Sequence, residues 1–254
     1  MRARARAALV VLALNLEPAA DVTIDHAELD LLLRAVVRGE SVDYEAIRRD
    51  QRARLDVYLS RIAAIEPARL SQAEQIALYV NLYNATVLRA VAERYRPGYR
   101  PDADSFRLFD EPLARVAGRT MSLNDLEHRV LRARFDEPRV HVALVCAARS
   151  CPPLLPRAYT GRDLEAALEE RMRRFVTDPT RNEIDASART LRLSRIFEWY
   201  ADDFGGRASL ATYVARYLGR EVSGFVVDFL PYSWELNDVR GGATSAPDRS
   251  APGR

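Results

Sequence analysis

A long apolar segment between Ser71 and Tyr95 constrains the fold more than any other feature of the sequence. Ser71 is followed three residues later by Glu74, and this capping-box spacing predicts that a helix begins here. Apolar side chains from Ile76 to Leu88 recur over most of the circumference of the expected helix. Because a helix that is apolar nearly all round is normally buried on most sides, we expect the rest of the chain to pack around it.

Two asparagines interrupt this apolar helix. Asn81 and Asn84 are three residues apart and therefore share one face. A buried amide that finds no hydrogen-bond partner costs about 1–3 kcal/mol, so both side chains need a specific purpose. Either they bind the backbone of a neighbouring loop, such as the segment after Tyr95, or they line a site and contact its substrate.

The other periodic segments predict a helix-rich α+β fold. Apolar residues at helical spacing predict helices over residues 25–37, 52–65, 122–134, 163–176, 194–204 and 209–218. Strands are expected over residues 139–146, 190–193 and 225–230, and an irregular segment with a short hairpin over residues 96–121. We expect the first of these strands to be central, so that residues 21–238 form a single domain around a small central β-sheet.

The basic residues exclude several chemistries. All 38 of them are arginine, because the chain contains no lysine, and this excludes Schiff-base, pyridoxal, phosphate-loop-lysine and Ser–Lys enzymes. Arginine stays protonated at neutral pH and therefore cannot act as a general base. The glycine-rich dinucleotide fingerprint and the Gly-x-Ser-x-Gly nucleophile elbow are also missing from the sequence. We expect no cofactor.

The charges are balanced along the chain. The arginines are interspersed with 36 acidic residues, and the formal net charge is +2. This balance argues against nucleic acid as a partner, since nucleic-acid binders usually show a one-sided basic excess. Basic clusters such as Arg171, Arg173 and Arg174 lie among acidic residues at helical spacing, which is typical of a solvated helix face.

The two ends of the chain differ from the rest. Residues 1–20 begin with alternating arginines, continue with an apolar stretch and end in small residues, as a secretory signal peptide does. The apolar stretch is shorter than the ~20 residues of a membrane-spanning helix. A frayed helix or a misassigned start codon is the alternative. We expect an exported protein of the periplasm or cell envelope that does not span the membrane, with a disordered tail over residues 239–254.

Two of the three histidines and both cysteines lie close together in the sequence. His128 follows Glu127 on an expected helix, and His141 lies on the expected central strand. Cys146 ends that strand, and Cys151 lies in the loop after it. Random scatter of so few residues would rarely produce this cluster, so we expect the chemistry to be located here.

The expected strand sets the geometry of the cluster. His141 and Cys146 would point to opposite faces and lie roughly 16 Å apart at ~3.3 Å per residue, so a direct dyad between them is not expected. Cys151, in a loop, is the expected nucleophile. His141 or His128 would act as its base.

Further side chains complete the expected site. Arg149 is placed to lower the pKa of the Cys151 thiol from its ordinary value of ~8.5, or to bind the substrate. Glu127 is expected to orient the catalytic histidine. Asn81 and Asn84 would contact the substrate.

Two structural alternatives remain open for the same residues. In an exported protein, Cys146 and Cys151 would form a disulfide that closes a small loop, and His141 would be a hydrogen-bonded core residue. Alternatively, both cysteines with His128 and His141 would be metal ligands, although their spacing matches no familiar zinc pattern.

Four segments resemble the domain of unknown function 547 family. They are the runs 79–85, 122–128, 141–153 and 196–204, in the order and spacing of the family, and the resemblance extends over roughly residues 25–236. It implies that Asn81, Asn84, Glu127, His128, His141, Cys146 and Cys151 are candidate functional residues. The family implies no established reaction. Its bacterial members are often exported.

Two hypotheses of different classes follow from the sequence. The first is a cysteine-dependent hydrolase or acyl transferase that acts on a small-molecule or peptide substrate, through an amide or ester bond. The second is a non-enzymatic exported binding or scaffold domain, held by the Cys146–Cys151 disulfide. The substrate and the oligomeric state are not predicted.

Overall fold

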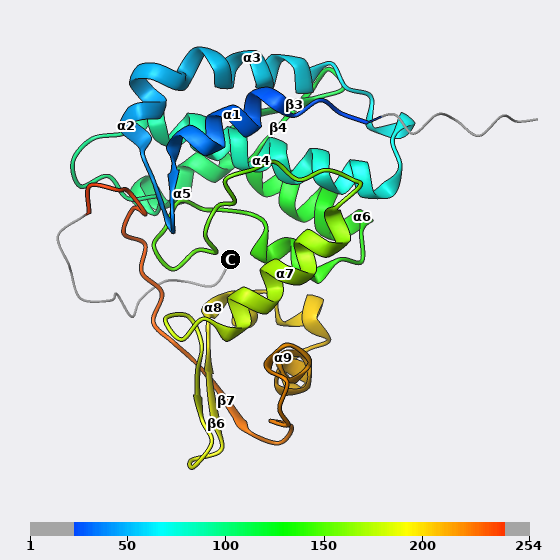
Figure 1. Cartoon of the computed structure of the whole chain (residues 1–254), viewed down its shortest axis with the longest axis vertical. Helices are drawn as coiled ribbons and strands as arrows, with labels where there is room; N and C mark the ends of the chain where they lie inside the picture. Colours follow the sequence, from blue (N-terminus) through cyan, green and yellow to red (C-terminus); the bar gives the residue numbers. More distant parts are fainter. Residues whose placement is uncertain (1–22, 242–254) are drawn as a thin grey trace, which may run out of the picture.

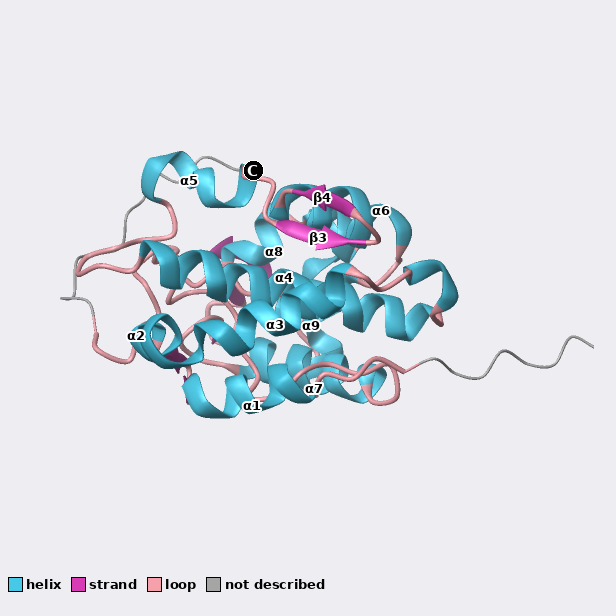
Figure 2. Ribbon diagram, turned by 90° about the horizontal axis from the view of Figure 1, so that it is seen from above, coloured by secondary structure: helices cyan, strands magenta, loops and turns pink. Residues whose placement is uncertain are grey.

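Helix α4 (Gln72–Arg94) runs through the middle of the helical layers of the computed structural model, which describes residues 23–241 (Figure 2). Its N-terminus is capped by Ser71, whose side-chain oxygen accepts a hydrogen bond from the backbone N–H of Glu74 at 3.3 Å. Every residue from Ile76 to Leu88 is buried. The predicted burial of this helix on nearly all sides is confirmed.

The segments that precede α4 cover one side of it. They comprise α1 (Ala27–Val36), α2 (Tyr44–Ala46), the π-helical turn η1 (Ile47–Gln51), α3 (Arg52–Ala63) and the 3-10 turn η2 (Pro67–Arg69). Helix α3 packs on α4, and α1 packs in turn on α3 (Figure 2). Between α1 and α2, the short strands β1 (Val37–Arg38) and β2 (Ser41–Val42) form an antiparallel hairpin.

A second group of segments lies on the other side of α4 (Figure 2). It contains α5 (Ala103–Asp110), β3 (Ala114–Val116), β4 (Arg119–Met121), the π-helical segment η3 (Asp125–Leu131) and α6 (Arg132–Arg134). Strands β3 and β4 are the short hairpin predicted within residues 96–121. The same segment also contains α5, which the sequence does not predict.

Residues 164–229 form a smaller lobe, from which the last described residues return to the larger one (Figure 1). Its helical elements are α7 (Leu164–Thr177), α8 (Arg195–Trp199), η5 (Ala201–Phe204), η6 (Arg207–Ser209) and α9 (Leu210–Leu218). Its strands are β5 (Glu183–Asp185), β6 (Thr190–Leu193) and β7 (Val226–Phe229). Strand β6 pairs antiparallel with β5 and parallel with β7 in one three-stranded sheet. The predicted helix-rich α+β class is confirmed, and this sheet lies at one end of the molecule.

The prediction of a strand over residues 139–146 is wrong. The chain instead forms the 3-10 turn η4 (Pro138–Val142), and the backbone N–H groups of Ala143 and Leu144 both donate to the carbonyl of Val140. The next N–H, that of Val145, donates to the side chain of Asn84 at 3.0 Å. Because the turn and the Asn84 side chain already satisfy these backbone groups, they are not available for pairing with a strand, despite the β-branched residues of this segment.

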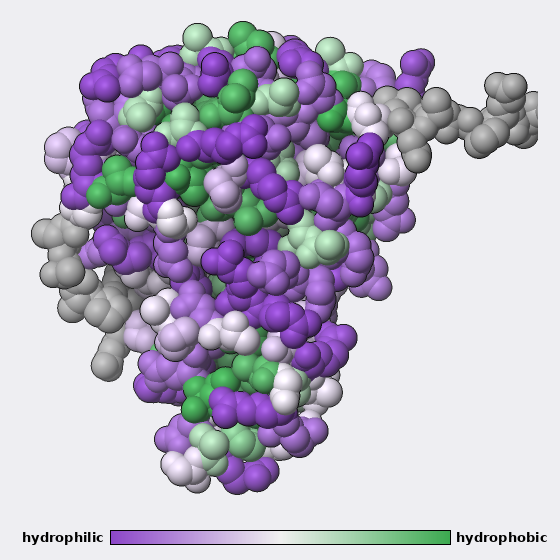
Figure 3. All heavy atoms as spheres, in the orientation of Figure 1, coloured by the Kyte–Doolittle hydropathy of each residue, from purple (hydrophilic) through white to green (hydrophobic). Residues whose placement is uncertain are grey.

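The expectations for the two ends fall largely outside the described residues. The signal peptide over residues 1–20 lies outside them entirely, and the tail over residues 239–254 lies outside them from residue 242 onwards. Within residues 23–241, none of the helices combines the length and the apolar character needed to cross a bilayer. On the face drawn in Figure 3, hydrophilic residues cover most of the surface.

His26 is buried between α3 and α4, with 4% of its surface exposed. Its Nδ1 lies 2.8 Å from the hydroxyl of Tyr58, and its Nε2 lies 3.3 Å from the amide nitrogen of Asn81. Burial lowers the pKa of His26 to about 4, because the charged imidazolium would lose its hydration. The neutral imidazole is therefore part of the core.

This buried histidine predicts a pH dependence of stability. Its folded-state pKa of about 4 lies below the unfolded value of ~6.5, so its contribution is complete above pH 6.5 and is lost as the pH falls towards 4. We expect the free energy of unfolding to drop by about 3 kcal/mol over this range through His26 alone. Chemical denaturation of the wild type and His26→Gln at pH 4.5–7 measures it. If the free energy of unfolding depended on pH equally in the two proteins, His26 would not be the group responsible.

Candidate functional site

A cavity of about 60 Å³ lies beside η4, between α4 and the segment that follows β7. Six of the thirteen residues that line it are aromatic, namely Tyr83, Phe109, Trp199, Tyr200, Tyr232 and Trp234. Four further lining residues carry titratable groups, namely Glu127, His141, Cys146 and Cys151. A cavity of this size has room for a few water molecules or for one end of a small ligand.

His141 is held rigidly at one side of this cavity. Its Nε2 lies 2.7 Å from Oδ2 of Asp203, and its ring stacks on Tyr200 with centroids 3.8 Å apart. Its other nitrogen, Nδ1, is buried and has no hydrogen-bond partner among the described residues. The nearby carboxylate oxygen Oε1 of Glu127 lies 3.9 Å from Nδ1, beyond hydrogen-bonding distance.

Asp203, at the end of η5, determines which nitrogen of this imidazole donates a hydrogen bond. Burial alone would raise the pKa of Asp203, but hydrogen bonds from Arg132 and His141 outweigh it and hold the pKa well below its ordinary value. Arg132 donates through Nε and Nη2 to both carboxylate oxygens, at 2.6 and 2.8 Å. Because Asp203 is a carboxylate acceptor, the neutral ring of His141 carries its proton on Nε2, and Nδ1 is left as an acceptor.

His128 lies outside the cavity. Its Nδ1 accepts a hydrogen bond from Nη1 of Arg132 at 2.9 Å, so it supports the guanidinium that in turn holds Asp203. Both His128 and Glu127 lie on the π-helical segment η3, but only Glu127 comes near His141. Of the two predicted base candidates, the structure brings only His141 to the cavity that the cysteines line.

The two cysteines are free thiols, so the disulfide of the second hypothesis is not formed in the structure. Cys151 is buried, and its sulfur accepts a hydrogen bond from the backbone N–H of Cys146 at 2.8 Å. Burial raises the pKa of the Cys151 thiol well above its ordinary value. Cys146 is half-buried, and its sulfur lies 3.2 Å from the hydroxyl of Tyr232.

Tyr232 keeps its proton beside this sulfur. Burial, followed by the proximity of Cys146 and Cys151, raises the pKa of Tyr232 well above its ordinary value. A tyrosine hydroxyl that stays protonated at neutral pH is able to donate to the sulfur of Cys146. Such donation favours the thiolate over the neutral thiol.

The backbone turns sharply directly after Cys146. Ala147 has a φ of 64°, a left-handed conformation that costs a non-glycine residue on the order of 1–2 kcal/mol. The turn is held from the C-terminal side, because the N–H of Asn237 donates to the carbonyl of Ala147 at 2.9 Å. Strained residues of this kind cluster at functional sites, where the surrounding structure fixes them.

Residues 67–176 match the family described as "Protein of unknown function, DUF547". This match covers 110 of the 254 residues and supports assignment of the chain to the DUF547 family. No curated protein and no solved structure matches the chain. The DUF547 match includes α4, Glu127, His141 and both cysteines, whereas Asp203 and Tyr232 follow it in the sequence.

The two asparagines of the DUF547 segment bind backbone. The amide of Asn84 donates to the carbonyl of Ala143 at 2.9 Å and accepts from the N–H of Val145 at 3.0 Å. The amide of Asn81 makes the same pair of bonds with the N–H and carbonyl of Tyr159, at 2.9 and 2.8 Å. Neither residue lines the cavity. Their expected contact with loop backbone is confirmed, but the loops differ from the expected one after Tyr95.

Two further expectations for the DUF547 segment find no support in the geometry. The guanidinium of Arg149 pairs with Glu235 at 3.3 Å on the surface, and Arg149 does not line the cavity. Among residues 23–241, no three His, Cys, Asp or Glu side chains come together as metal ligands would. The proposed metal site of His128, His141, Cys146 and Cys151 is therefore not formed by the described chain.

Sequence reasoning missed Arg132, Asp203 and Tyr232. Asp203 lies in the run 196–204 that carries the family resemblance, but no pattern links it to His141, which lies 62 residues earlier. Tyr232 lies 86 residues after Cys146 and had no sequence signal of its own. The resemblance of the run 196–204 was the one available pointer to this part of the site.

We expect Asn84→Ala to lower the free energy of unfolding by about 2–4 kcal/mol, because it leaves two buried backbone groups without partners. Asn124→Ala is a matched control, since the Asn124 amide donates to Asp110 at the surface, and it is expected to cost less than about 1 kcal/mol. Chemical denaturation of both variants measures the difference. Equal losses would contradict the role of Asn84.

Proposed function

We propose that the protein is a cysteine-dependent hydrolase or acyl transferase, with Cys146 as the nucleophile and His141 as the general base. One observation carries the proposal. The imidazole of His141 is fixed by a carboxylate at Nε2, its Nδ1 has no hydrogen-bond partner within residues 23–241, and it lines the same apolar cavity as the thiol of Cys146. This follows the acid–imidazole–nucleophile logic of acyl-transfer enzymes.

The contacts favour Cys146 over Cys151 as the nucleophile. Burial raises the pKa of the Cys151 thiol, and a raised pKa disfavours the reactive thiolate. The backbone N–H of Cys146 donates to the sulfur of Cys151 and by itself lowers the pKa of Cys151, but burial outweighs it. Cys151 therefore acts as a structural sulfur that fixes the position of Cys146, while Cys146 is half-buried beside a hydroxyl donor.

Acyl transfer through this site conserves protons at each step. Nδ1 of His141 takes the thiol proton as Sγ of Cys146 bonds to the substrate carbonyl carbon. The bond to the leaving group then breaks, and the imidazolium returns the proton to that group. A water molecule or an acceptor alcohol or amine next gives a proton to His141 and attacks the thioester, which releases the product and restores the thiol with that proton.

Glu127 and Tyr232 would support the charges that develop during this reaction. The carboxylate of Glu127 lies 3.9 Å from Nδ1 of His141 and would stabilise the imidazolium when it forms. The hydroxyl of Tyr232 would donate to the thiolate or to the oxyanion of the intermediate. Glu127 thus has an electrostatic role, and the orienting role falls to Asp203.

The wall of the cavity indicates the class of substrate. Its aromatic side chains favour an uncharged, apolar acyl group, presented as an ester, thioester or amide of a small molecule or peptide. We further propose that this reaction takes place after export, in the periplasm or cell envelope. That location rests on the pattern of residues 1–20 alone.

We expect Cys146→Ser to abolish covalent labelling and turnover, because the hydroxyl replaces the only proposed nucleophile. With p-nitrophenyl butyrate as the probe, the acylation rate should fall about a thousandfold or more. Cys151→Ser is the matched control and should keep most of the rate, since its hydroxyl still accepts the N–H of Cys146. Mass spectrometry should locate the butyryl group on Cys146, and a butyryl group on Cys151 would contradict the assignment.

Asp203→Asn tests the orienting role separately. An asparagine can donate to Nε2 of His141, which would move the ring proton to Nδ1 and remove the base. We expect the acylation rate of Cys146 to fall on the order of 10²- to 10⁴-fold with little change in KM. Asp202→Asn, at the exposed neighbouring residue, should leave the rate unchanged. A rate for Asp203→Asn equal to that of Asp202→Asn would rule out the His141–Asp203 pair as catalytic machinery.

A further inference from the structure

A second cavity, of about 250 Å³, lies against α7 and shares no lining residue with the first. Arg171 and Arg174 line it from adjacent turns of the helix, together with Glu40, Pro153 and Asp178. The sequence predicts a solvated face for these arginines, but Arg171 is only 6% exposed. An arginine so deeply buried is normally paired with an acidic group.

Arg171 has no such partner among the described residues. Its Nη2 donates to the carbonyl of Pro153, and its Nε is buried without a hydrogen-bond partner. Its guanidinium forms no ion pair with any carboxylate of the described chain, since the acidic groups of the cavity are engaged elsewhere. Burial, and to a smaller extent the positive charge of Arg174, lowers the pKa of Arg171.

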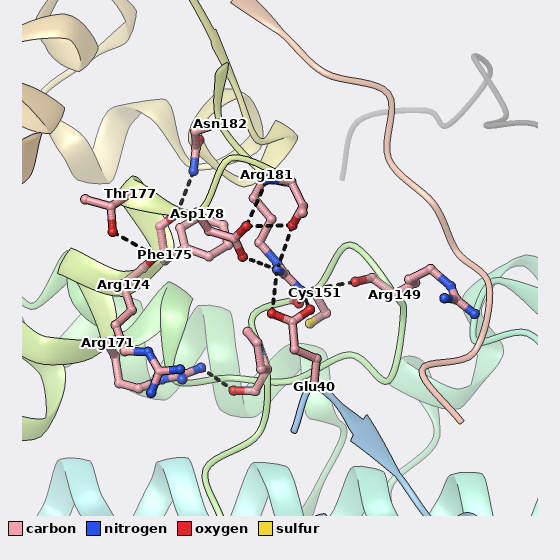
Figure 4. A network of polar contacts seen from close by, with 12 residues as sticks. Glu40, Arg149, Cys151, Arg171, Arg174, Phe175, Thr177, Asp178, Arg181 and Asn182 are labelled. Carbon is pink, nitrogen blue, oxygen red and sulfur yellow. Dashed lines mark hydrogen bonds and ion pairs between the residues drawn. The ribbon is translucent and has the colours of Figure 1, made fainter. Parts of the chain in front are cut away.

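Arg174 adds a second uncompensated charge to the same cavity. It is exposed, and within residues 23–241 its guanidinium makes neither a hydrogen bond nor an ion pair. In Figure 4 its side chain extends along the helix towards that of Arg171. Two like charges that share one cavity repel each other unless an anion lies between them.

The carboxylates of the cavity are already used by a third arginine. Arg181 donates through Nη1 and Nη2 to both oxygens of Glu40, at 3.3 and 3.1 Å, and also pairs with Asp178 (Figure 4). Three guanidinium groups therefore face two carboxylates. The charge that remains unbalanced lies on the side of Arg171 and Arg174.

We propose that Arg171 and Arg174 form a binding site for a small oxyanion of the phosphate class, either inorganic phosphate or a phosphomonoester. Guanidinium groups bind such oxyanions through paired N–H donors. A phosphate has a third oxygen beyond the two that one guanidinium binds, so it can accept hydrogen bonds from both arginines at once. The site is independent of the thiol chemistry proposed above, because the two cavities share no residue.

Anion binding here would also act on the segment that carries Cys151. Arg171 holds the carbonyl of Pro153, and Nη2 of Arg181 donates to the carbonyls of Arg149 and Cys151 at 3.3 Å each (Figure 4). An anion that restricts the motion of Arg171 would therefore also restrict Pro153, at one end of the segment 149–153. Phosphate is expected to stabilise the folded protein, since it binds a site that the unfolded chain lacks.

Calorimetric titration and thermal unfolding of the full chain with inorganic phosphate test this site. We expect saturable binding and a rise of Tm in the wild type, and at least a tenfold weaker affinity in Arg174→Gln. Arg174 is chosen because it is exposed, so that its replacement leaves the fold intact. Arg173→Gln is the matched control: it removes the same charge from the next residue, which pairs with Glu169 outside the cavity, and it should keep the wild-type affinity.

Two further measurements distinguish a phosphate site from a purely structural role of Arg174 and from nonspecific binding of anions. Without phosphate, Arg174→Gln should have a Tm equal to or above that of the wild type, because it removes a repulsion; a lower Tm would overturn the proposal. Sodium acetate at matched ionic strength should raise Tm less than phosphate does. Equal effects of acetate and phosphate, equal losses in Arg173→Gln and Arg174→Gln, or no binding by the wild type would each overturn it as well.

Discussion

Asn84 places a polar amide inside the long, buried helix α4, and that amide binds the backbone directly before Cys146. Neither partner has an alternative, because the helix around Asn84 is buried and the segment 143–145 has no neighbouring strand. Loss of either bond would leave a buried polar group unsatisfied. The position of η4, of the turn at Ala147 and of both cysteines therefore depends on this pair of bonds.

A chain of hydrogen-bonded polar groups leads to His141 at the wall of the cavity. It runs from His128 through Arg132 and Asp203 to His141, and each link is a hydrogen bond between 2.6 and 2.9 Å. The planar fork of Arg132 suits this arrangement, since it binds both oxygens of Asp203 and still reaches His128. A chain without lysine uses arginine for such tasks throughout, including the buried positions of Arg171 and Arg181.

The sequence predicted the parts of the fold that depend on local periodicity. Helix α4 with its cap at Ser71, helices α7 and α9, and strands β6 and β7 follow from spacing and capping patterns. The segment after Pro138 did not, because its β-branched residues favour a strand, whereas the amide of Asn84 and the 3-10 turn satisfy its backbone groups. That error had a consequence for the site, since a strand would have separated His141 from Cys146, and the turn lets both line one cavity. Asp203 and Tyr232 have no predictable link to the site in the sequence, because contacts between residues far apart in the chain leave no periodic pattern.

The last described segment of the chain closes the cavity. Tyr232 and Trp234 form part of its wall, and the residues that follow bond to Ala147 and to Val42, near the opposite end of the chain. During synthesis, Cys146 leaves the ribosome well before these residues do. The thiol of Cys146 and the imidazole of His141 are thus enclosed only when nearly the whole described chain has been made, so an incomplete chain carries both groups without the enclosure.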